Sequence, residues 1–309
     1  MHGYLLKIPK PNVIENIFIN GVFRIAVPFF FITSGYLFFK TMNKGNVSKW
    51  FKHIIKIYLL WSLIYIYKFG HIFFSQEFTS ISKLFHFIWL EIIGVSHLWF
   101  IPSLLVSALI CLSLNRFVRL RQREILYICL FLWVIGFSLN WFMIYSGYGY
   151  NRIFIFRNGL LFGLPLFLLG YLISNNESII LKSMPSISKW MIIAILLNFF
   201  ESIITFYFLK GIESKVIYSL DILLSTPPIA FLLFILTLKR KDIDIFGYNA
   251  RVSSTFMYYS HIIFLEFFSY LVSSVFEVSR MWNLFISLFT IAFILTLSYF
   301  FPKKLSRVI

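Results

Sequence analysis

The sequence predicts an all-α, polytopic membrane protein whose helices cross the bilayer as a bundle. Of its 309 residues, 60% are hydrophobic and 13% are charged, and the mean hydropathy is +0.84, whereas a soluble domain carries about 25% charged residues. The apolar residues come in runs near the ~20 residues that a membrane-spanning helix needs. These runs lack the alternation of a membrane β-barrel, and an aromatic content of 21% excludes a disordered chain.

Nine segments are long and apolar enough, or nearly so, to span a membrane. They are residues 22–39, 54–74, 98–114, 125–144, 159–174, 190–209, 220–238, 255–275 and 283–301. All nine are expected to be helices, because hydrocarbon tolerates no exposed backbone polar groups. The connection 75–97 is itself apolar and aromatic, which favours an interfacial helix across the mouth of the bundle. We expect one integral membrane domain over residues 1–309.

The excess of 28 Lys and Arg over 12 Asp and Glu is explained by membrane topology rather than by nucleic acid. One set of connections carries seventeen basic residues and the opposite set ten, and the richer set is expected in the cytoplasm. The C-terminus is then cytoplasmic, and nine spans place the N-terminus outside. Residues 1–7 resemble the end of a helix, so we expect a tenth helix upstream and a chain incomplete at its N-terminus. A true nine-span protein is the alternative.

Ionisable side chains deep in a membrane are costly and are functional candidates. Glu201 and Glu266 both fall near the expected bilayer midplane, and His261 precedes Glu266 on the same predicted helix. The alternative is that each carboxylate pairs with a neighbour and holds helices together. His97 comes two residues before Trp99, at the end of a predicted helix. It is either a candidate site residue or a membrane-interface anchor.

The segment from Arg24 to Leu37 combines several unusual features. Pro28 kinks a helix and frees a carbonyl, and Ser34 and Gly35 allow neighbouring helices to approach closely. With Arg24 at the helix mouth and Tyr36 beyond, these residues indicate a polar notch inside the bundle. Cys111 and Cys129 lie within apolar runs and indicate neither a disulfide framework nor a metal site.

At these residues the sequence resembles acyltransferase family 3, integral membrane enzymes that acylate surface polysaccharides. Three patches carry the resemblance: Arg24 to Leu37, His97-Leu-Trp-Phe100, and Ser253 to His261 with its Tyr-Tyr-Ser-His ending. Their order and spacing extend the likeness over essentially all 309 residues.

The resemblance implies ten helices in the cell (cytoplasmic) membrane and an O-acyltransferase, most often an O-acetyltransferase. The donor is acetyl-CoA or another acyl-CoA in the cytoplasm, and the acceptor is a hydroxyl of a surface polysaccharide or its lipid-linked precursor. Membrane lipid is a further expected partner, and no metal or nucleic acid is expected. From the resemblance and the intramembrane candidates together, we expect three catalytic residues and five substrate-binding residues. The expected catalytic residues are His2, Arg24 and His97, and the expected substrate-binding residues are Ser34, Tyr36, Trp99, His261 and Glu266.

The family's first helix carries an arginine followed about eleven positions later by an essential histidine. Only His2 corresponds to that histidine, and the arginine is absent. We therefore expect either a start codon placed too late or an inactive truncated remnant. A transporter of polysaccharide or lipid-linked sugar is a further alternative, because midplane carboxylates also suit proton-coupled transport.

Overall fold

The computed structural model describes residues 12–69, 81, 85, 96–118, 121–146, 154–209, 221–240, 247–274 and 280–305. The regular structure in these ranges is helical, with no strand among them, which confirms the all-α prediction. The chain divides into two compact units, one covering Asn12–Lys239 and a smaller one that includes Arg240–Ile309.

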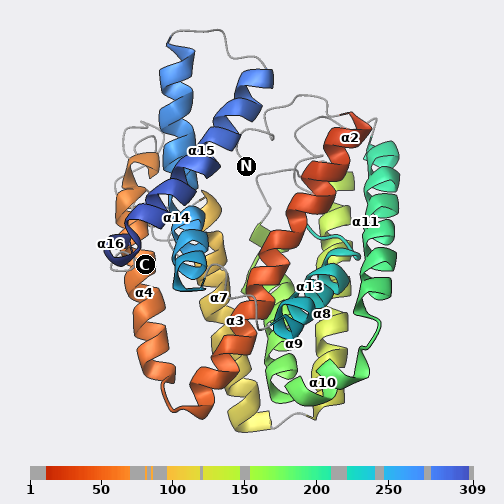
Figure 1. The fold of residues 1–309 in the computed structure, drawn as a ribbon. Helices are drawn as coiled ribbons and strands as arrows, with labels where there is room; N and C mark the ends of the chain where they lie inside the picture. The colour runs from red at the N-terminus through yellow and green to blue at the C-terminus, as the bar shows by residue number, and fades with distance from the viewer. Residues whose placement is uncertain are drawn as a thin grey trace. The chain divides into compact units, whose positions relative to one another are not determined.

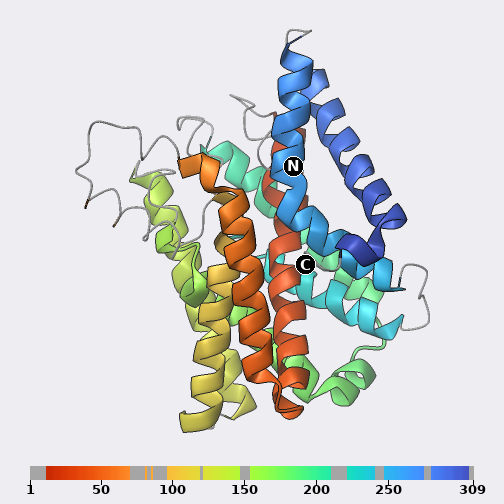
Figure 2. The same ribbon diagram turned by 90° about the vertical axis from the view of Figure 1, so that its left-hand side faces the viewer.

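The larger unit begins with a nearly continuous helical run. Asn12 caps α2 (Val13–Asn16), a π turn (Ile17–Gly21) and a 3-10 turn (Val22–Ile25) follow, and α3 covers Ala26–Asn43. A reversal at Gly45, whose φ is +68°, leads into α4 (Val47–Ile64). Helices α3 and α4 form an antiparallel hairpin, seen in both orientations in Figures 1 and 2.

The remaining helices follow the apolar runs of the sequence. In the larger unit they are α7 (Phe100–Ser113), α8 (Gln122–Tyr145), α9 (Leu164–Asn175), α10 (Glu177–Ser183), α11 (Ile187–Leu209) and α13 (Thr226–Lys239). The smaller unit contains α14 (Gly247–Ser273), α15 (Arg280–Phe300) and α16 (Pro302–Leu305). Each of the nine predicted segments thus contains a helix.

Four described helical stretches are long and apolar enough to cross a membrane. They are Val13–Asn43, His97–Val118, Gln122–Tyr145 and Ile187–Phe208. The pair Gly159–Asn175 and Glu177–Ser183, bent by 91°, makes a fifth if it counts as one span. Such a set is consistent with a multi-pass membrane protein. By length and composition, the described helices support fewer spans than the nine predicted, in part because α13 has only 14 residues.

The tightest helix packing in the larger unit joins α3 to α9. A Cβ atom added to Gly35 would lie 1.9 Å from the carbonyl oxygen of Phe167, and one added to Gly170 would lie 1.9 Å from that of Ile32. The two backbones meet at glycines from both sides, which confirms that Gly35 permits a close approach of helices. Ser34, the neighbouring small residue, is half-buried.

Candidate functional site

A buried ion pair forms where the N-terminal helical run meets the segment before α13. Arg24 lies in the 3-10 turn just before α3, and its Nη1 donates a hydrogen bond to Oδ1 of Asp221. Only 8% of the Arg24 side chain and 5% of the Asp221 side chain are exposed. Charges so deeply buried are stable only when they are paired and hydrogen-bonded, so each residue requires the other.

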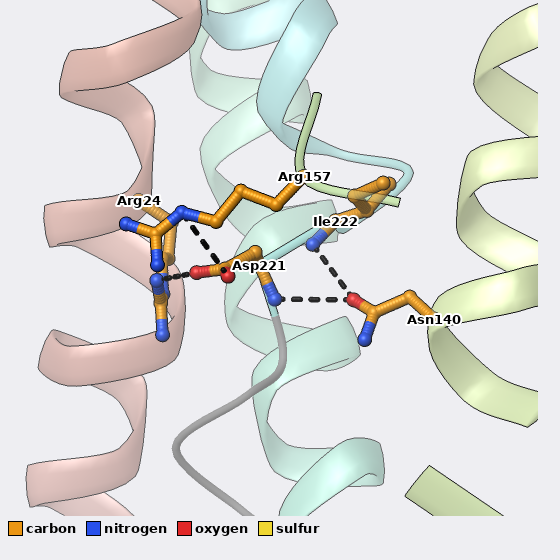
Figure 3. A network of polar contacts seen from close by, with 5 residues as sticks. All are labelled: Arg24, Asn140, Arg157, Asp221 and Ile222. Carbon is orange, nitrogen blue, oxygen red and sulfur yellow. Dashed lines mark hydrogen bonds and ion pairs between the residues drawn. The ribbon is translucent and has the colours of Figure 1, made fainter. Parts of the chain in front are cut away.

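A second arginine reaches the same carboxylate. The Nε atom of Arg157 lies 3.6 Å from Oδ2 of Asp221, the other oxygen of the carboxylate that Arg24 contacts (Figure 3). The Arg157 guanidinium also lies 4.3 Å from the centre of the Trp99 ring, within the range of a cation–π interaction. Asp221 and Trp99 together fix the orientation of this second guanidinium group.

The backbone around Asp221 is held by α8. Asn140, which is fully buried on α8, accepts hydrogen bonds at its Oδ1 from the backbone N–H groups of Asp221 and Ile222, at 3.1 and 3.0 Å (Figure 3). Buried backbone N–H groups need such an acceptor because water does not reach them. Asn140 therefore fixes the backbone from which the Asp221 carboxylate extends.

Glu201 of α11 holds the next part of this segment. Its carboxylate accepts hydrogen bonds from the N–H of Leu224 at 2.7 Å, and from the N–H and Oγ of Ser225 at 2.9 and 2.5 Å. These donors lie at the N-terminus of α13, where a carboxylate is favoured by the helix dipole. The sequence left two alternatives for Glu201, a functional carboxylate or one that holds helices together. The structure shows the second, since Glu201 joins α11 to the beginning of α13.

Two of the predicted site residues meet in this cluster. Arg24 contacts Asp221 directly, and Trp99, which is buried, joins through Arg157. His97 lies two residues before Trp99 in the 3-10 turn Ser96–Trp99, and its ring centre is 4.7 Å from that of Tyr65 in an edge-on contact.

Tyr36 lies in a different polar cluster. It is twelve residues after Arg24 along the same helical run, about 18 Å at the α-helical rise. Its hydroxyl donates to Oε2 of Glu177 at 2.7 Å and accepts from Nζ of Lys40 at 2.5 Å. The structure therefore does not bring Tyr36 to the arginine pair, and its assignment to substrate binding stays a prediction.

The other predicted residues lie outside the larger unit or outside the described residues. His261 and Glu266 are on α14 of the smaller unit; Nδ1 of His261 lies 2.9 Å from the carbonyl oxygens of both Met257 and Tyr258, and Glu266 is exposed. Because a carbonyl only accepts, Nδ1 carries the hydrogen in this arrangement. His2 falls outside the described residues, as does most of the connection 75–97.

Sequence reasoning missed Asp221, Arg157 and Asn140 as site residues. In the sequence, Arg157 is one of the ten basic residues in the less basic set of connections, and Asn140 lies within the predicted span 125–144. A signal for Asp221 was present, since it is an acid within the predicted span 220–238, where a charge is unusual.

Chemically, the cluster is suited to stabilising negative charge. Two guanidinium groups converge on one point in an apolar bundle, and fixed donors in such surroundings stabilise a developing oxyanion more strongly than water does. Among the described residues, no three His, Cys, Asp or Glu side chains come together as a metal site.

Comparison with known proteins adds one finding to this geometry. A family model described as an acyltransferase domain matches residues 2–301 of the chain. No curated protein matches it, and neither does any solved structure.

Proposed function

The chain belongs to acyltransferase family 3, and from this membership we propose that it is an O-acyltransferase of the cell membrane. The proposed reaction moves an acetyl or other acyl group from acyl-CoA in the cytoplasm to a hydroxyl of a surface polysaccharide or of its lipid-linked precursor. The excess of Lys and Arg in one set of connections supports a chain orientation in which those connections and the C-terminus lie in the cytoplasm, on the side of the acyl-CoA.

The observation that carries the proposal is the cluster of Arg24, Arg157 and Asp221. In acyl transfer, the acceptor oxygen attacks the thioester carbonyl carbon, and negative charge develops on the carbonyl oxygen. The C–S bond then breaks, the thiol leaves with a proton, and the new ester remains on the acceptor. Arg24 and Arg157 are the groups we assign to the developing charge, since they are preorganised in a water-poor site.

The proton of the acceptor hydroxyl requires a base. We assign this role to His2, because a neutral imidazole accepts a proton near physiological pH. His97 is assigned to orienting the acceptor; it lies two residues before Trp99, whose ring supports Arg157. Replacement of His2 by alanine is expected to abolish transfer, and wild-type turnover in that variant would remove the assignment.

The proposal is tested with the full chain reconstituted in lipid vesicles and supplied with radiolabelled acyl-CoA. Asp221→Asn removes the charge that holds both arginines, and we expect consumption of thioester to fall by about 10²- to 10³-fold. Glu15→Gln is the matched control, because glutamine serves equally in the helix cap that Glu15 forms with Asn12. A wild-type protein that neither binds nor consumes thioester would refute the proposal.

Mass analysis of surface glycans from cells with and without the gene separates the enzyme from the transporter alternative. Loss of an acyltransferase removes an acyl increment from the glycan and leaves the polymer in place. Loss of a transporter removes the exported polymer itself.

A further inference from the structure

An apolar groove lies along α8 in the larger unit, with a volume of about 540 Å³. Its walls come from α8, α9 and the beginning of α13, and they include Leu126, Leu130 and Val134, which are exposed side chains of a candidate membrane span. A volume of this size is typical of pockets for small molecules.

Helix α8 provides a measure of length along the groove. Arg123, an exposed residue in the first turn of α8, lies at one end of the groove, and Trp133 lines it ten residues later, about 15 Å along the helix axis. Leu224 also lines the groove, and it is three residues from Asp221. The groove therefore has a cation at the beginning of α8 and borders the segment that carries Asp221.

Trp133 offers an unused donor at the inner end. The side chain is 6% exposed, and its indole N–H has no hydrogen-bond partner among the described residues. A buried N–H group without a partner is costly, which makes it a site for a ligand's acceptor atom. The Trp133 ring also packs on Phe162 at 5.4 Å, and Phe162 packs on Trp99 at 5.5 Å. Continuous ring contacts thus lead from the groove to the Trp99 ring beneath Arg157.

We propose that this groove binds the acyl donor, with Arg123 at the phosphates of coenzyme A and the thiol-bearing arm lying along α8. This inference rests on the proposed acyl transfer. The arm is an extended chain with methylene and methyl groups that suit apolar walls, and its amide and thioester carbonyls accept hydrogen bonds. The Trp133 N–H donates to one of these carbonyls, and the acyl end points toward Arg157.

The spacing of the polar groups distinguishes this occupant from a bilayer phospholipid. A phospholipid also has a phosphate and an aliphatic chain, but its ester carbonyls lie directly beside the phosphate. The groove instead places its donor at Trp133 about 15 Å from Arg123, where a phospholipid has only hydrocarbon.

The test measures donor binding and turnover with the full chain in lipid nanodiscs, using coenzyme A for titration and acetyl-CoA for kinetics. Three variants perturb the groove: Arg123→Gln removes the cation, Leu130→Trp fills the volume, and Trp133→Phe removes the N–H together with part of the ring. We expect each to raise the KM for acetyl-CoA and the Kd for coenzyme A, about tenfold for Arg123→Gln, with kcat largely kept.

Two matched controls make the same chemical changes away from the groove. Lys182→Gln removes an exposed cation on α10, and Leu196→Trp enlarges an exposed leucine on α11; neither is expected to change donor KM by more than about twofold.

The outcomes distinguish a failure of the groove proposal from a failure of the proposed function. Wild-type transfer together with unchanged donor KM and coenzyme A affinity in Arg123→Gln and Leu130→Trp would overturn the groove and leave the proposed function standing. Variants that alter only the dependence of the rate on anionic phospholipid would assign the groove to lipid and also overturn the inference. A wild-type protein that does not bind coenzyme A would overturn both proposals.

Discussion

Replacing Gly35 by alanine tests the helix packing that positions Arg24. The added Cβ would lie 1.9 Å from the Phe167 carbonyl oxygen and 2.8 Å from its carbonyl carbon. Both are backbone atoms of α9 and cannot rotate away, whereas real Cβ contacts essentially never fall under 3.0 Å. The two helices must therefore separate by roughly 1 Å, at a cost toward or above the upper end of the 1–3 kcal/mol typical of overpacking.

The shift also moves the helical run that carries Arg24. Because a misplacement of about 1 Å costs as much as 10²-fold in rate, we expect slower thioester consumption as well as a lower midpoint of denaturant unfolding in detergent micelles. Ser34→Ala, one residue away, is the control and is expected to change stability by less than about 1 kcal/mol. Gly170→Ala should behave like Gly35→Ala, and the double variant should lose less than the sum, since one separation relieves both clashes.

Wild-type stability and wild-type transfer in Gly35→Ala would refute this reasoning. Such a result would mean that α3 and α9 do not approach each other through their glycines.

Three further predictions concern the segment that carries Asp221. Asn140→Ala leaves the N–H groups of Asp221 and Ile222 without their acceptor and should cost about 1–3 kcal/mol of unfolding free energy; an unchanged denaturation midpoint would contradict the role of Asn140. Glu201→Ala removes the cap of α13 and should cost about 1–2 kcal/mol, and the denaturation midpoint again measures it; no loss would show that the cap is not formed. Arg157→Lys keeps the charge but loses the planar fork and the stacking on Trp99, so transfer should fall by about 10- to 100-fold with little change in unfolding; full activity in vesicles would exclude Arg157 from the reaction.

The helices themselves were predictable because their signal is local. A run of apolar residues such as 125–144 indicates by itself that the segment lies in the hydrocarbon of the membrane. There, only a helix satisfies the hydrogen bonds of the segment's own backbone. The structure places α8 over Gln122–Tyr145, a few residues beyond the predicted bounds at its N-terminal end and one at the other. Gly35 was predictable for the same reason, since a small residue in an apolar run indicates close packing wherever the partner lies.

Part of the candidate site was also predictable. Arg24 and Trp99 were identified from the patches that resemble the family, and the structure connects them through Arg157 and Asp221. Tyr36 belongs to the same patch as Arg24, yet the rise of the helix carries it to another cluster with Lys40 and Glu177. Sharing a patch of sequence does not mean sharing a site, because a helix separates residues along its axis.

The sequence by itself determined that this chain is an all-α membrane protein and that it resembles a family of acyltransferases, since composition, apolar run length and short patches are properties of consecutive residues. Only the tertiary structure decided which charges meet. Arg24 and Asp221 are 197 positions apart, and neither residue reveals its partner locally. A buried charge is stable only when it is paired with an opposite charge. The fold provides that pairing for Arg24 and Asp221 by bringing their two segments together.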